Sequence, residues 1–175
     1  PDYFAAILAN QILGGGAEAR LFLNLREDKG FTYGAYSGLS DSHKTKGRFR
    51  ASTSVRNAVT DSAVVEILYE IDKIRNDLVT DEELDLVKAK YAGNFVISLE
   101  DPETVANFAL DIKTQNLPAD FYKNYLKNIN AVSKEEVMAA AKKYFLNDRA
   151  RIVVTGKGSA ILEGLEQLSF NNQPI

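Results

Sequence analysis

Residues 12–37 read ILGGGAEARLFLNLREDKGFTYGAYS, and the hydrophobic period changes in the middle of this stretch. Over residues 17–27 the apolar side chains recur at helical spacing. Over residues 31–40 they alternate with small or polar residues, as in a half-buried strand. Gly30 separates the two patterns and predicts the end of the helix. This stretch therefore predicts a helix that turns directly into a sheet.

A second strand is expected over residues 47–56, where apolar positions alternate with Arg48, Arg50, Ser52, Ser54 and Arg56. The polar residues between the two strands predict an antiparallel hairpin. That loop contains the single histidine, His43, which we interpret as a solvated loop residue. One face of the hairpin is therefore expected to be polar.

A helix over residues 3–13 precedes this region, and a long helical half follows it. Capping boxes begin two of the later helices, and Asp101-Pro102 begins another. The expected segments are helices over 61–78, 80–99, 101–116, 121–129, 133–146 and 160–168 and an apolar strand over 151–155. The helix after Asp101 is expected to bury a stripe made of Val105, Phe108, Ala109 and Ile112, and residues 171–175 are expected to be loose.

The order of these segments predicts a single α+β domain over residues 1–175, with a small, mainly antiparallel sheet and several helices packed on one face. Three strands are few for so much helix, so we expect a further strand upstream of Pro1. The chain starts in a helical pattern without Met, which we interpret as a piece of a longer polypeptide.

The composition excludes several functions. The formal net charge is −3, which argues against a general nucleic-acid surface. No apolar run is long enough to span a membrane, and no secretory signal opens the chain. The chain has no cysteine, and one histidine cannot provide a three-ligand zinc site. The Gly14-Gly15-Gly16 run lacks the Lys-Ser/Thr of a phosphate loop, and we interpret it as a helix stop and a turn.

The combined pattern of residues 12–37, 117–122 (LPADFY), 129–133 (INAVS) and 152–156 (IVVTG) resembles the C-terminal-type, non-zinc-binding domain of the pitrilysin/insulinase zinc peptidases, the inverted zincins of peptidase family M16. The resemblance implies a metalloprotease-like α/β roll. It also implies a clamshell in which one domain carries the zinc motif His-x-x-Glu-His. The other domain supplies an arginine and a tyrosine seven positions apart, and Arg26 and Tyr33 match these positions.

The resemblance implies that Tyr33 is catalytic, through a hydrogen bond to the transition-state oxyanion, and that Arg26 and Tyr33 bind substrate. Two structural interpretations stay open. Tyr33 is in register with Phe31 and Ala35 and could be a core aromatic, and Arg26 could pair with Glu27 or Asp28. Glu18 and Arg20 are expected to be surface or inter-domain residues.

The chain is thus expected to be the substrate-binding half of a zinc metalloendopeptidase, with no metal of its own. Zinc would lie on a partner peptidase domain in the same polypeptide or a separate subunit, and the substrate would be a peptide or unfolded polypeptide. Nucleic acid and membranes are not expected partners. The alternatives are an inactive structural or assembly subunit and a peptide-binding module that uses its sheet edge. The sequence does not reveal the compartment; the expected options are a soluble protein of the bacterial cell envelope or periplasm, or of the cytoplasm.

Overall fold

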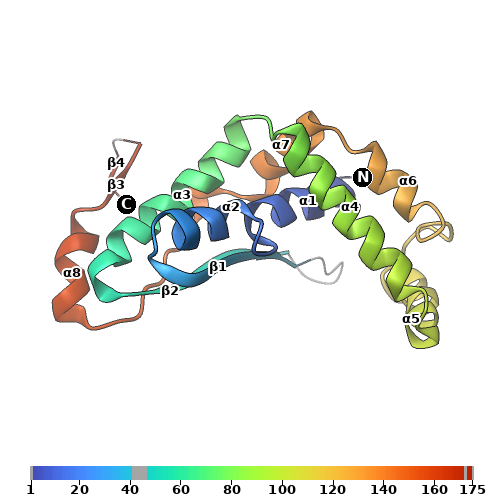
Figure 1. The fold of residues 1–175 in the computed structure, drawn as a ribbon, viewed down its shortest axis with the longest axis horizontal. Coiled ribbons are helices and arrows are strands. Elements are labelled where there is room, and N and C mark those ends of the chain that lie inside the picture. Colours follow the sequence, from blue (N-terminus) through green and yellow to red (C-terminus); the bar gives the residue numbers. More distant parts are fainter. Residues whose placement is uncertain (1, 41–46, 172, 175) are drawn as a thin grey trace.

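The computed structural model describes residues 2–40, 47–171 and 173–174 (Figure 1). The helices are α1 (Tyr3–Gly14), α2 (Arg20–Phe22), α3 (Thr60–Asn76), α4 (Asp81–Ser98), α5 (Pro102–Thr114), α6 (Tyr125–Ala131), α7 (Lys134–Tyr144) and α8 (Gly158–Glu166). A π-helix, η1 (Leu23–Asp28), and two 3-10 helices, η2 (Asn57–Val59) and η3 (Asn147–Arg149), connect them. The strands are β1 (Thr32–Leu39), β2 (Phe49–Val55), β3 (Ser169–Phe170) and β4 (Gln173–Pro174). His43 and its loop lie outside the described residues.

The predicted hairpin is confirmed, because β1 and β2 pair as antiparallel strands. Its inner face, which includes Ala35, Phe49 and Val55, contributes to the hydrophobic core. Figure 1 shows the hairpin along one side of the molecule, with α1 and α3 running above it. The α+β class with helices packed over a small antiparallel sheet is therefore confirmed.

Helix α1 runs through the centre of the core, and its buried residues are Ala5, Ala6, Leu8, Ala9, Ile12, Leu13 and Gly14. It packs against α7, α4 and β1. At Gly14 the helix comes so close to β1 that an added Cβ would lie 2.4 Å from the amide nitrogen of Ser37. The first glycine of the predicted stop is thus the last residue of the helix, and only a hydrogen fits between the two backbones.

The structure confirms that helices begin at the predicted capping motifs. The Thr80 hydroxyl accepts from the Glu83 amide at 3.1 Å, and the Glu83 carboxylate accepts from the Thr80 amide at 2.8 Å. Ser133 and Glu136 form the same reciprocal pair at the start of α7, and Asp101 caps α5. Local hydrogen bonding therefore fixes where these three helices begin.

Several expected segments differ in the structure. The helix predicted over residues 17–27 is a short α2 followed by a π-helix, and the one predicted from residue 121 begins only at Tyr125. Residues 151–155 form no strand, because no other strand of the described chain pairs with them, and Val153 is 85% exposed. Residues 171–175 were expected to be loose, but within this range Gln173–Pro174 form β4, which pairs with β3.

The prediction that α5 buries an apolar stripe is also wrong, because α5 has no buried residue and Val105 is exposed. Aromatic stacking holds this end of the chain instead. Phe108 stacks on Phe95 of α4 and on Tyr122, with ring centroids 5.7 and 3.9 Å apart. No helix in the described part of the chain is both long and apolar enough to cross a membrane.

An ion pair ties α2 to the start of α4. The Arg20 side chain, only 12% exposed, donates to both carboxylate oxygens of Glu83 at 2.6 and 2.8 Å. Arg20 was expected to be a surface or inter-domain residue, but its side chain is largely covered within the described chain, whereas Glu18 pairs with Lys90 at the surface. Burial raises the pKa of Glu83, but the hydrogen bonds and charge of Arg20 lower it by more, so the net pKa lies below the ordinary 4.5.

We expect Glu83→Gln to lower the free energy of unfolding by about 2 kcal/mol at neutral pH, because the buried guanidinium loses its counter-charge. The folded-state pKa of Glu83 is depressed, so this stabilisation is complete above about pH 4.5 and is lost as the pH falls through the lower folded value. Denaturant titrations between pH 7 and 3 measure both effects. Glu82→Gln, an exposed change in the same helical turn, is the control, and equal losses in the two variants would contradict the assignment.

Candidate functional site

A β-bulge interrupts β1 at the candidate tyrosine. Thr32 pairs with Val55 and Ala35 pairs with Thr53, so Tyr33 and Gly34 together lie opposite Ser54. Two residues against one form a bulge, which bends the strand and redirects side chains. The bulge therefore changes which face of the sheet Tyr33 occupies.

Two threonine hydroxyls stabilise this bulge. The Thr32 hydroxyl donates to the carbonyl oxygen of Ser54 at 2.7 Å and accepts from the amide of Gly34 at 3.1 Å. The Thr53 hydroxyl donates to the carbonyl oxygen of Gly34 at 2.9 Å. The backbone groups that the bulge takes out of the inter-strand hydrogen-bond pattern, such as the Gly34 amide and carbonyl, therefore bond to threonine side chains instead.

The consequence is that Tyr33 points away from the core and is 94% exposed, whereas Ala35 is fully buried. The interpretation of Tyr33 as a core aromatic in register with Ala35 is therefore wrong. Without the bulge, the two residues would share a face, since the side-chain period of a strand is two. The phenol is free to meet a molecule outside the described chain.

Arg26 lies on the π-helix η1, where the amide of Lys29 donates to the carbonyl of Asn24, five residues earlier. Single π-turns are rare and often occur at functional sites. The guanidinium carbon of Arg26 lies 4.7 Å above the ring of Phe22, and its Nε lies 3.5 Å from the Glu27 carboxylate. The side chain is 46% exposed, so the pairing with Glu27 leaves donors available to solvent.

The sequence interpretation missed the polar anchor of η1, Asn24, which is buried. Its amide donates to Glu66 at 2.9 Å and to Glu70 at 2.8 Å, both on α3. Lys29 completes this contact with an ion pair to Glu66 at 3.3 Å. The one signal in the sequence was a lone asparagine inside the apolar run LFLNL, because a buried amide requires hydrogen-bond partners.

A continuous set of contacts connects Arg26 to the bulge. The ring of Phe22, over which the Arg26 guanidinium lies, is 5.9 Å from the ring of Tyr36, measured between centroids. The Tyr36 ring in turn covers Gly34, where an added Cβ would come within 2.7 Å of it. Contacts through the buried Phe22, the exposed Tyr36 and Gly34 therefore link both predicted site residues.

An open depression of about 490 Å³ lies on the outer face of the hairpin, lined by Thr32, Tyr33, Gly34, Tyr36, Arg50, Ser52, Thr53 and Ser54. Five of its side chains other than Tyr33 carry hydroxyl groups, and its one charged residue is Arg50. Arg26 lies outside it, beyond Phe22. Hydrogen-bond donors on an open sheet face are suited to an extended polar ligand rather than to an enclosed small molecule.

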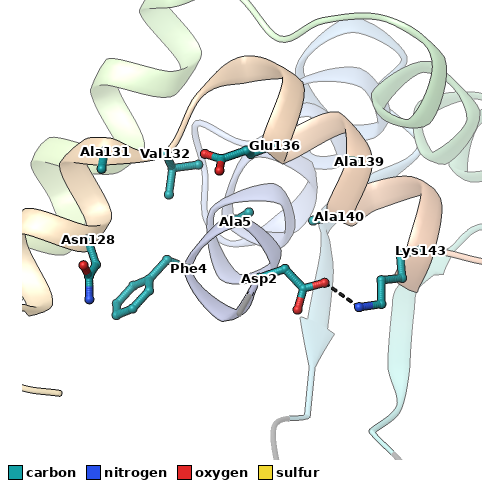
Figure 2. Close-up of a pocket in the computed structure, with 10 residues that line it drawn as sticks. All are labelled: Asp2, Phe4, Ala5, Asn128, Ala131, Val132, Glu136, Ala139, Ala140 and Lys143. Carbon is teal, nitrogen blue, oxygen red and sulfur yellow. Dashed lines mark hydrogen bonds and ion pairs between the residues drawn. The ribbon is translucent and has the colours of Figure 1, made fainter. Parts of the chain in front are cut away.

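A second groove, of about 570 Å³, lies between α1, α6 and α7 (Figure 2). Figure 2 shows Asp2 and Lys143 facing each other there, with carboxylate and ammonium 2.6 Å apart. Tyr144 also donates to Asp2 at 2.9 Å, and Glu136 is engaged in the α7 cap. These polar groups stabilise the packing of α1 on α7. No three His, Cys, Asp or Glu side chains of the described residues form a group that could hold a metal.

The comparisons with known proteins place this fold in a zinc-peptidase family. Residues 1–91 match the family described as Peptidase M16 inactive domain, so the chain belongs to that family. It is 27% identical to the uncharacterized zinc protease YmxG of Bacillus subtilis, over 87% of this chain and 37% of that protein. The same identity over the same share of the chain relates it to the uncharacterized zinc protease Rv2782c of Mycobacterium tuberculosis, of which it covers 34%.

Solved structures agree with this assignment. The peptidase M16 inactive domain from Pseudomonas fluorescens superposes with a TM-score of 0.77 at 30% identity, over 84% of this chain and 35% of that one. A protease from Helicobacter pylori shares the fold, with a TM-score of 0.74 at 21% identity over 83% of this chain and 35% of that one. The chain spans little more than a third of the length of these relatives.

We expect Thr32→Val to release the bulge, because the hydroxyl that bonds both Gly34 and Ser54 is lost while the side chain keeps its size. The free energy of unfolding should fall by about 1–2 kcal/mol, and the Gly34 amide should exchange its hydrogen faster. Hydrogen-exchange NMR and denaturant titration measure the two effects. Thr155→Val, at an exposed threonine, should change stability by less than about 0.5 kcal/mol. An unchanged Gly34 exchange rate would contradict the role of Thr32.

Proposed function

We propose that this chain is the substrate-holding half of a zinc metallopeptidase and acts as one domain over residues 1–175. The zinc lies on another peptidase domain, in the same polypeptide or a separate subunit. The observation that carries the proposal is the phenol of Tyr33, which a hydroxyl-bonded bulge holds outward into solvent. The membership in the M16 inactive-domain family and the zinc proteases among its relatives support it.

Tyr33 would act on the scissile peptide bond. Zinc on the partner supplies a polarised water and a Lewis acid for hydrolysis. As the carbonyl becomes tetrahedral, its oxygen gains negative charge, and the Tyr33 hydroxyl donates a hydrogen bond to it. A donor oriented before the reaction stabilises that charge without reorganisation. The bulge provides this orientation, because it fixes the backbone on both sides of Tyr33.

Arg26 would hold the backbone of the bound peptide. Its planar guanidinium offers five donors and stays charged at every relevant pH. The stacking on Phe22 restricts the side chain on one side, while the exposed donors are directed to solvent. A peptide that runs from Arg26 past the exposed Tyr36 to Tyr33 would present its carbonyl oxygens to Arg26 before it reaches the phenol.

We expect Tyr33→Phe, in the chain assembled with its zinc-binding partner, to lower kcat by about 100-fold, because one oxyanion donor is removed. Zinc content and the thermal midpoint should stay unchanged, since the ring is exposed and its hydroxyl bonds to no described residue. Steady-state hydrolysis of a quenched fluorescent peptide and metal analysis measure these quantities.

Tyr69→Phe is the matched control, because it removes the same hydroxyl from a half-exposed tyrosine on α3 and should leave kcat as it is. Full activity of Tyr33→Phe would overturn the catalytic role. It would leave the chain as a structural subunit or as a module that binds peptides through its sheet edge.

We expect Arg26→Lys to raise KM by about tenfold while kcat changes little. Lysine keeps the charge but loses the planar set of donors that can bond two carbonyl oxygens. The same fluorescent peptide, titrated over a wide concentration range, separates the two constants. A tenfold fall in kcat with KM unchanged would instead indicate that Arg26 contacts the substrate only in the transition state.

A further inference from the structure

The outer face of β2 carries a row of positive charge. Side chains alternate along this strand, so Arg50 shares the exposed face with Ser52 and Ser54, and the exposed Arg48 and Arg56 flank the two ends of the strand. Arg50 lines the hairpin depression next to Tyr36 and Ser52. The remaining lining side chains are neutral, so Arg50 is the one charged group that lines the depression.

These arginines have no counter-charge within the described residues, where no ion pair involves Arg48, Arg50 or Arg56. Of the two acids on the neighbouring η1, Glu27 pairs with Arg26, and the exposed Asp28 forms no ion pair with these arginines among the described residues. The chain as a whole has a net charge of −3, so the row is a local concentration of positive charge rather than part of a basic surface. Unpaired cations beside a binding face favour ligands that carry the opposite charge.

There is also room for a ligand next to Arg50. Gly38 is its partner across the hairpin, and no atom lies within 4 Å of the place where a Cβ of Gly38 would be. Arg50 and Ser54, which faces Tyr33, are four residues apart on the same strand, which corresponds to roughly 13 Å at about 3.3 Å per residue. An extended peptide held at Tyr33 would thus reach Arg50 with a side chain about four residues from the reacting bond.

We propose that Arg50 selects peptides with an acidic side chain, Asp or Glu, about four residues from the bond that is cleaved. This inference rests on the proposed function, because it takes the outer face of the hairpin as the peptide surface. Arg50 is a specificity-determining residue in this scheme. Arg48 and Arg56 extend the positive field toward both ends of β2 and attract the acidic segment.

The test uses the assembled peptidase and three fluorogenic peptides that differ only in the residue four positions from the cleaved bond, which is Glu, Gln or Lys. We expect kcat/KM to be about fivefold higher for the Glu peptide than for the Lys peptide, as for one partly exposed ion pair. The ratio should approach one at 1 M salt, because exposed charges are screened there. Both flanks of the bond are varied in turn.

Arg50→Glu should reverse the preference, so that the Lys peptide is cleaved about fivefold faster than the Glu peptide. Lys127→Glu makes the same charge change at an exposed position of α6, far from the hairpin, and should keep the original ratio. A reversal in both variants would show an effect of net charge alone and would overturn the proposal.

The outcomes for the two proposals are separate. If Tyr33→Phe loses turnover on all three peptides while Arg50→Glu leaves the Glu/Lys ratio unchanged, the acidic preference is overturned and the proposed function stands. If Tyr33→Phe cleaves all three peptides at the original rate, the proposed function fails, and the inference fails with it. A single-stranded oligonucleotide that inhibits better than the uncleaved Glu peptide would identify the row of arginines as a phosphate-binding surface and overturn a peptide preference.

Discussion

The close approach of α1 to β1 at Gly14 and Ser37 determines how the rest of the molecule is arranged. The Ser37 hydroxyl also donates to the side-chain oxygen of Asn10 at 3.0 Å, so helix and strand are joined again one turn before the glycine. With α1 fixed there, its other sides are covered by α7 and α4. The inner face of the hairpin is thereby committed to the core, and the opposite face is left for contacts with other molecules.

Both residues of the candidate site lie on irregular backbone next to this junction. Arg26 is on a π-helix and Tyr33 is in a β-bulge, and each irregularity has polar side chains that complete its hydrogen bonding. Thr32 and Thr53 serve the bulge, and Asn24 ties the π-helix to α3. Such features cost stability, so their support by specific side chains is consistent with a functional role.

Ion pairs stabilise several contacts between the helices. Among the described residues, Arg20 pairs with Glu83 and Lys143 pairs with Asp2. These pairs join α2 to α4 and α1 to α7, so they stabilise the fold. Arg48, Arg50 and Arg56 have no ion pair among the described residues, which leaves their charge available for recognition outside the described chain.

The sequence by itself determined the α+β class, the hairpin and the starts of α4, α5 and α7, because alternation, capping boxes and an Asp-Pro cap are local signals. It also identified Arg26 and Tyr33 as candidates, through the resemblance of residues 12–37 to a known family. Only the tertiary structure decided that Tyr33 is exposed and that residues 151–155 form no strand. A bulge changes the register by one residue and a strand needs a partner, and both depend on chain segments far apart in the sequence.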